Sequence, residues 1–216
     1  MEEILLLHIV FKILCIVFIL CNIYTQEESK LIFSFNIGLS KPGSPAEFSD
    51  NWGSGYNLGL GIGKSISSRF QIQAVLNFNN FSLDHPVFIK NINPSTYNIT
   101  AEEIPYLTAT GGERNLLSLL TRIKYLYSRH GNSKVLPYAF IGAGMFRQYI
   151  DKIQILPSRI DIDKKTETSL LVSAGLGTDL LLEKHTNLFF EIAPEICFIE
   201  SDMVIYYSLK IGFLVK

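Results

Sequence analysis

Six ionisable side chains share one face of four predicted strands: Arg122, Lys124, Asp179, Glu191, Glu195 and Lys210. Successive side chains of a strand point to opposite sides, and the other face of these strands is almost free of charge. Three cations and three anions can offset one another in a dry interior, where a lone charge is costly. Two roles fit such a set: a structural ion network, or a path for protons or small ions. We favour the structural network, because filled, closed interiors commonly need one.

Other arrangements that could carry chemistry are weak. The segment Gly59–Ser65, GLGIGKS, is similar to a phosphate-binding loop, but that motif needs a glycine where this chain has Leu58. His85 lies in the longest predicted connection, whereas His130 and His185 lie in short turns at the other end, so the three cannot converge on a metal or a nucleophile. We therefore expect no catalytic residue, no cofactor and no metal site.

Composition sets the broad class. A chain of 216 residues with 48% hydrophobic content suffices for one domain with a sizeable core. The net charge of −1 offers no basic stripe, so nucleic acid is not an expected partner. Mean hydropathy is +0.24, yet beyond the N-terminus no stretch of about twenty residues is apolar enough for a spanning helix. If the chain enters a membrane, it does so as strands.

The first 25 residues differ in kind from the rest. A continuous apolar run, Ile13–Leu20, follows Lys12 and is typical of a secretory signal peptide, which we place at residues 1–25, with the barrel domain at 26–216. An uncleaved anchor helix and a lipidated Cys21 remain alternatives. Cleavage would leave Cys197 as the only cysteine of the mature chain, which excludes an internal disulfide.

Alternating polarity recurs along most of the remaining chain and predicts eight strands: 31–39, 54–64, 69–82, 115–128, 135–148, 168–183, 187–199 and 203–215. The connections alternate between long, polar loops and short turns rich in Gly, Asn and Ser. The long loops are 40–53, 83–114 and 149–167. This asymmetry is typical of outer-membrane barrels, whose short turns lie on the periplasmic side and whose longer loops lie outside.

The volume of the apolar set indicates which face points outward. The apolar positions carry far more bulky side chains than the narrow lumen of an eight-stranded barrel can hold, so they must face lipid. The small and polar set fits inside, and in strand 135–148 we place Gly142 and Gly144 in the interior. The sequence therefore predicts an all-β fold, an eight-stranded antiparallel up-and-down transmembrane β-barrel with a filled polar interior and no wide pore.

Four short segments carry a family resemblance: Gly59–Gly63, Pro137–Gly144, Ala174–Gly177 and Leu188–Glu191. In this order, over residues 29–216, the chain resembles the small outer-membrane β-barrel domain family of Gram-negative bacteria. The resemblance implies a barrel in the outer membrane, usually without enzymatic activity, that contributes to envelope integrity, adhesion or host interaction. The final segment, residues 208–216, partly resembles the terminal strand signal that the barrel-insertion machinery recognises.

We therefore expect a non-enzymatic integral outer-membrane barrel with a structural, envelope or surface-interaction role. Its expected partners are outer-membrane lipids, the barrel-insertion machinery during biogenesis, and an external protein or surface ligand bound through loops 40–53, 83–114 and 149–167. Two alternatives stay open: an outer-membrane lipid-modifying enzyme, and a soluble lipocalin-like barrel that binds a ligand in an apolar cavity.

Overall fold

The computed structural model describes residues 31–97, 99–100, 102–127, 134–157, 160–183, 185–199 and 202–216. The predicted signal peptide, residues 1–25, lies outside the described residues. Within them, no helix is both long enough and apolar enough to cross a membrane.

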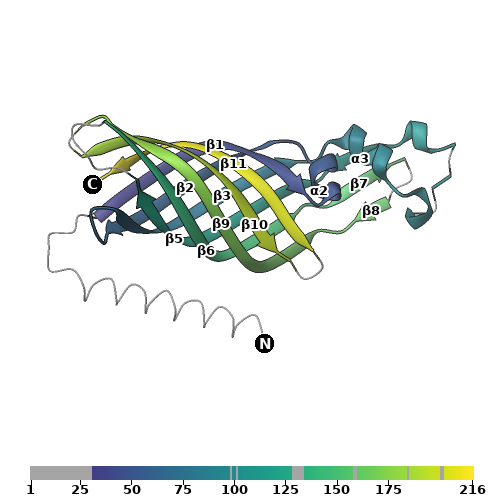
Figure 1. Ribbon diagram of the computed structural model, residues 1–216. Coiled ribbons are helices and arrows are strands. Elements are labelled where there is room, and N and C mark those ends of the chain that lie inside the picture. The colour runs from purple at the N-terminus through teal and green to yellow at the C-terminus, as the bar shows by residue number, and fades with distance from the viewer. Residues whose placement is uncertain are drawn as a thin grey trace.

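Eight strands close into a barrel in the order β1-β11-β10-β9-β6-β5-β3-β2, and every neighbouring pair is antiparallel (Figure 1). The strands are β1 (Leu31–Ser44), β2 (Gly55–Ser65), β3 (Phe70–Ser82), β5 (Glu113–Leu126), β6 (Val135–Ile150), β9 (Lys165–Leu181), β10 (Thr186–Phe198) and β11 (Met203–Val215). Sequence neighbours pair in space, and β1 closes the ring against β11 with Phe33 opposite Val215. The eight predicted strands are confirmed, with ends that shift by a few residues.

Burial alternates along every strand of the barrel. In β11 the odd-numbered residues lie outside and the even-numbered residues lie inside, as the period of two requires. The outward set is apolar and stays highly exposed, for example Leu39 at 63%, Leu60 at 58% and Ile141 at 62%. Exposed apolar surface on this scale needs lipid, so the outer wall is a membrane-facing apolar belt.

The face assignment of β6 is confirmed. Tyr138, Phe140 and Phe146, which share the parity of Gly142 and Gly144, are buried in the lumen, whereas Ile141 points to lipid. Glycine is required at position 144 for steric reasons, because a Cβ there would clash with the backbone carbonyl of Leu119 on the neighbouring strand.

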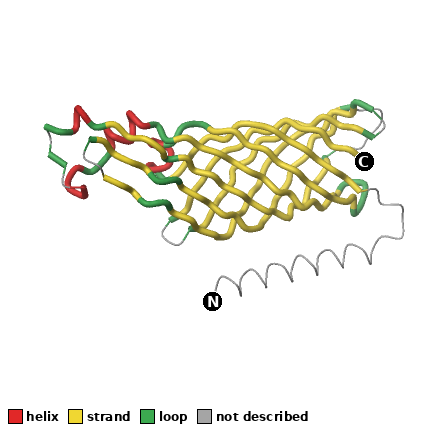
Figure 2. Tube along the Cα trace, turned by 180° about the vertical axis from the view of Figure 1, so that it is seen from behind, coloured by secondary structure: helices red, strands yellow, loops and turns green. Residues whose placement is uncertain are grey.

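The long connections all emerge at the end of the barrel opposite the C-terminus (Figures 1 and 2). Their described parts fold into further elements: α2 (Ala46–Asn51), α3 (His85–Asn91), η1 (Pro94–Tyr97), η2 (Ile104–Tyr106), β4 (Thr108–Gly111), β7 (Ile153–Leu156) and β8 (Ile160–Ile162). Strands β4, β7 and β8 form a separate antiparallel sheet. We call α3, η1, η2, β4, β7 and β8 the extension. The three long connections are confirmed, but the sequence analysis did not predict the helices and strands within them.

The extension has its own hydrophobic core. Ile155 is 0% exposed and packs with Leu107 and Ile99, while Ile153 packs with Ala109. Partly buried side chains of α3 and its neighbours cover the same side of the small sheet. Packing of this kind makes the extension an ordered part of the protein.

The junction between the extension and β5 requires glycine. Gly111 and Gly112 both have positive φ, 79° and 80°, a conformation that other residues rarely adopt. The Gly112 carbonyl accepts a hydrogen bond from the Leu83 amide at 3.0 Å, and a Cβ on Gly112 would lie 2.8 Å from the Leu83 side chain. These contacts fix the point at which the chain leaves the small sheet and enters the barrel.

Candidate functional site

The six ionisable residues predicted from the sequence lie together in the middle of the lumen. Strand β5 supplies Arg122 and Lys124, β9 supplies Asp179, β10 supplies Glu191 and Glu195, and β11 supplies Lys210. They form three ion pairs: Arg122–Glu191 at 2.8 Å, Lys124–Asp179 at 2.8 Å and Lys210–Glu195 at 2.7 Å. None of the six side chains is more than 9% exposed, so each cation offsets one anion away from water.

Neutral side chains add hydrogen bonds to this cluster. Arg122 Nε donates to Gln73 Oε1 at 2.8 Å, and the Tyr138 hydroxyl donates to Glu191 Oε2 at 3.1 Å. The Tyr206 hydroxyl donates to Glu195 Oε2 at 2.9 Å. Buried charge pairs are stabilised when their remaining donors and acceptors are satisfied, and these three side chains supply such bonds to Arg122, Glu191 and Glu195.

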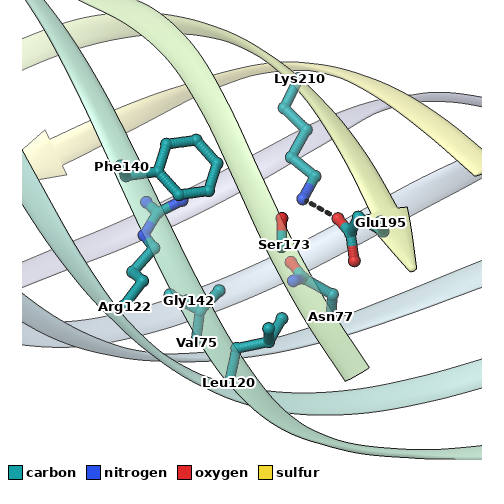
Figure 3. A pocket seen from close by; sticks show the side chains of 9 residues that line it. All are labelled: Val75, Asn77, Leu120, Arg122, Phe140, Gly142, Ser173, Glu195 and Lys210. Carbon is teal, nitrogen blue, oxygen red and sulfur yellow. Dashed lines mark hydrogen bonds and ion pairs between the residues drawn. The ribbon is translucent and has the colours of Figure 1, made fainter. Parts of the chain in front are cut away.

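Aromatic faces cover the two cations of β5. The Arg122 guanidinium lies 4.9 Å from the centroid of the Phe140 ring, and Lys124 Nζ lies 3.5 Å from the centroid of Tyr138 (Figure 3 shows the first contact). A cation over a ring face is attracted by the ring quadrupole, most strongly when water is excluded. The sequence analysis missed Gln73, Tyr138 and Phe140 as partners, although all three lie at inward positions of their strands.

The space left beside the ion pairs is small. Figure 3 shows a cavity in the lumen, with the Lys210–Glu195 pair on one side and Arg122 with Phe140 on the other. It holds about one water molecule. Its lining residues are Val75, Asn77, Leu120, Arg122, Phe140, Gly142, Ser173, Glu195 and Lys210. A cavity of this size cannot take a lipocalin-like ligand, and the outward apolar belt rules out that alternative.

The mouth below the extension is closed by α2, which turns into the barrel. Phe48 of α2 is 1% exposed and packs edge-to-face on Phe81, with ring centroids 5.2 Å apart. Phe81 in turn packs on Tyr206 at 5.7 Å. We call α2 with Phe48 the plug. The first long connection, residues 40–53, therefore directs Phe48 inward, whereas the sequence analysis expected a loop for external contacts.

Arg114 holds the plug from the barrel wall. Its guanidinium carbon lies 4.2 Å from the centroid of the Phe48 ring, and its Nη2 donates to Gln148 Oε1 at 2.6 Å. Gln148 Nε2 donates to Glu167 Oε2 at 3.1 Å, which links three strands at the mouth. The sequence analysis placed Arg114 in a loop because the predicted strand began one residue later.

Toward the end that carries the C-terminus, Ile32, Phe189 and Leu214 form a buried apolar cluster. The interior is filled, as predicted, and it contains clusters of apolar side chains as well as the polar and charged ones. The inward aromatic residues fit because glycines lie opposite them, as Gly177 lies opposite Tyr138.

The remaining candidates for chemistry do not assemble. Gly59–Ser65 belongs to strand β2, which confirms that it is not a phosphate-binding loop. In the extension, His85 Nε2 lies 2.7 Å from the Gly111 carbonyl oxygen, whereas His185 lies in a turn at the opposite end of the barrel; His130 lies outside the described residues. Among the described residues, no three His, Cys, Asp or Glu side chains are placed to share a metal ion.

Comparison with known proteins gives the fold. No family model matches the chain, and no curated protein matches it by sequence. Among solved structures, the Neisserial surface protein A superposes with a TM-score of 0.58 at 14% identity, covering 88% of this chain and 99% of that one.

Two further structures are similar. A major outer membrane protein of Thermus thermophilus has a TM-score of 0.52 at 11% identity, over 86% of this chain and 99% of that one. OprG of Pseudomonas aeruginosa has a TM-score of 0.51 at 15% identity, over 87% of this chain and 94% of that one. The chain therefore has the fold of the eight-stranded outer-membrane β-barrels.

Proposed function

We propose that this chain is a non-enzymatic integral protein of the bacterial outer membrane that presents the extension outside the cell for structural or adhesive contacts. The observation that carries the proposal is the division of the molecule into an apolar wall, a sealed lumen and a folded extension. The apolar wall faces lipid, and the cavity beside the ion pairs has room for about one water molecule. The extension is the part left to meet other molecules.

The orientation follows from the connections. Short turns and the chain end lie on the periplasmic side in barrels of this type, which puts the extension on the outside. Partners there would be an external protein or a surface ligand bound through residues 83–114 and 149–167. The plug in residues 40–53 would contribute less, since Phe48 lies in the lumen. Outer-membrane lipids and the barrel-insertion machinery are the other proposed partners.

Two measurements on the purified protein test this function. Protein extracted from outer membranes should migrate faster cold than boiled on a gel, because the closed barrel resists detergent unfolding. In planar bilayers it should give no steady ion conductance, since buried side chains fill the lumen, α2 packs into one mouth and the lumen charges are paired. A steady open-channel current from the unmodified chain would contradict the proposal, and so would a protein that stays soluble without detergent.

A further inference from the structure

A group of hydrogen-bond donors lies on the outer wall where the apolar belt ends, next to the extension. Its centre is Arg147 of β6, an exposed, outward-facing side chain. Directly opposite on β9 lies Thr168, also exposed, and directly opposite on β5 lies Leu117 of the apolar belt. Residues directly opposite each other in an antiparallel pair have side chains in contact distance, so Arg147 and Thr168 act as one site.

The belt continues to the edge of this site. Leu117 is 48% exposed, and Leu170, the next outward residue of β9 from Thr168 toward the belt, is 45% exposed. Met145 occupies the corresponding position on β6. A lipid whose acyl chains lie against these three side chains places its headgroup at Arg147 and Thr168.

Charge is unbalanced at this point of the wall. Arg147 takes part in none of the ion pairs found among the described residues. The nearest inward carboxylate of β9, Glu167, already binds Lys165 at 3.1 Å and Gln148. The acids Glu113 and Asp151 lie further from the belt, at the start of β5 and just beyond the end of β6. An unpaired guanidinium next to a hydroxyl is suited to a phosphate group.

A second cation occupies the equivalent position on the opposite wall. Lys41 of β1 is the first polar outward residue after Leu39, and it lies opposite Tyr207 of β11. In the barrel order, β1 and β6 are four strands apart, so Lys41 and Arg147 face lipid on opposite sides. Both cations lie at the end that bears the extension, and neither forms an ion pair among the described residues.

We propose that Arg147 with Thr168, and separately Lys41, bind the phosphate groups of phosphorylated glycolipids in the leaflet next to the extension. Lipid is the source of the phosphate because each cation adjoins the apolar belt instead of standing in a water-filled pocket. This inference rests on the proposed membrane location. It adds the lipid class and the residues that select it.

The experiment measures retention of bisphosphorylated lipid A and of its phosphate-free form by the full chain in detergent, by native mass spectrometry. The unmodified protein should retain the phosphorylated form preferentially. Arg147→Gln and Lys41→Gln should each weaken that binding about fivefold, and the double variant about 25-fold, because the two cations are independent. Lys152→Gln is the matched control: Lys152 pairs with Asp161 in the extension, away from the belt, and its loss should leave binding unchanged.

Three results would overturn the proposal. One is equal retention of the two lipids by the unmodified chain, and another is unchanged binding by the double variant. The third is complete displacement of lipid A by millimolar inorganic phosphate, which would indicate a site for free anions. Each variant is also run cold and boiled on a gel. If the heat shift persists while the phosphate preference is absent, only this inference fails; if the unmodified chain has no heat shift, the proposed function fails too.

Discussion

The barrel and the extension are stabilised by different interactions. The barrel strands are 11 to 17 residues long and are held by continuous ladders, and the charged middle of the lumen is stabilised by paired ions. The strands of the extension have 3 or 4 residues, and its core is made of aliphatic and aromatic side chains. The comparison shows that the wall depends on backbone pairing in lipid, whereas the extension depends on side-chain packing in water.

The largest effect should come from breaking one buried ion pair of the barrel. Glu191→Leu leaves the Arg122 guanidinium without its carboxylate and removes the acceptor of the Tyr138 hydroxyl. We expect a loss of about 4 kcal/mol in the free energy of unfolding, because an uncompensated buried charge remains. Urea titration of the folded barrel in lipid vesicles, followed by the gel shift, measures it.

A second substitution separates this charge effect from lost packing. Arg122→Met in the Glu191→Leu chain removes the orphaned charge and should restore most of the stability. The exposed pair Lys152–Asp161 supplies the control, since Lys152→Gln should cost less than about 1 kcal/mol. A double variant as unstable as the single one would show that the ion pairs are not what stabilises the lumen.

The plug is expected to matter somewhat less. Phe48→Ala empties the space beside Phe81 and should cost about 3 kcal/mol, while Glu47→Ala on the exposed side of α2 should cost little. Cys197 reports the opening, because its thiol is 0% exposed in the same cluster as Phe48. In a chain with Cys15 and Cys21 replaced by serine, Cys197 should react with a thiol reagent only when Phe48 is absent. A thiol that stays protected would contradict the sealing role of α2.

A substitution in the small sheet tests whether the two regions are independent. Ile155→Ala should destabilise the extension by about 2 kcal/mol, because Ile155 is buried at the centre of its core. Limited proteolysis should then cut the extension while the barrel keeps its gel shift. Leu156→Ala, 42% exposed on the other face of β7, is the control and should leave the cutting pattern unchanged. Loss of the barrel gel shift in Ile155→Ala would show that the regions fold as one unit.

The smallest expected effect is a loss of stability of the extension at acidic pH. Hydrogen bonds from Lys152 and then Gln154 hold the pKa of the Asp161 carboxyl below its ordinary value. A lowered folded pKa means that the stabilising contribution is present above the ordinary pKa of about 4 and is lost as pH falls through the folded value. The protection factors of the β7 and β8 amides, which compare each exchange rate with the intrinsic rate at the same pH, should therefore fall at acidic pH. In Asp161→Asn this pH-dependent step should disappear; its persistence would assign the step to another group.

The barrel could be predicted from the sequence because inward and outward side chains alternate over more than ten residues in each strand, as in Met203–Val215. The bulk of the outward residues then fixed which face meets lipid. The six lumen charges followed from the same parity, and the structure places all six within three ion pairs.

The extension and the plug were not readable for physical reasons. Strands as short as Ile160–Ile162 are too short to show a clear alternation of polarity. The small sheet also depends on the pairing of β7 with β4, which belongs to a different connection and lies far from β7 in the sequence. Phe48 carries no periodic signal in a helix of 6 residues. Arg114 differs again: it shares the parity of Arg122, and a strand one residue longer would have placed it in the lumen.

The most direct test of the account asks which face of the barrel touches lipid. The chain has a single tryptophan, Trp52, so Trp52→Phe with Ile141→Trp places one fluorophore on the outward belt. Thr108→Trp in the same background places it in the extension. In vesicles with brominated acyl chains, we expect strong quenching at position 141 and little at position 108. Equal quenching at the two positions, or none at 141, would contradict a lipid-facing apolar wall around a sealed, ion-paired lumen.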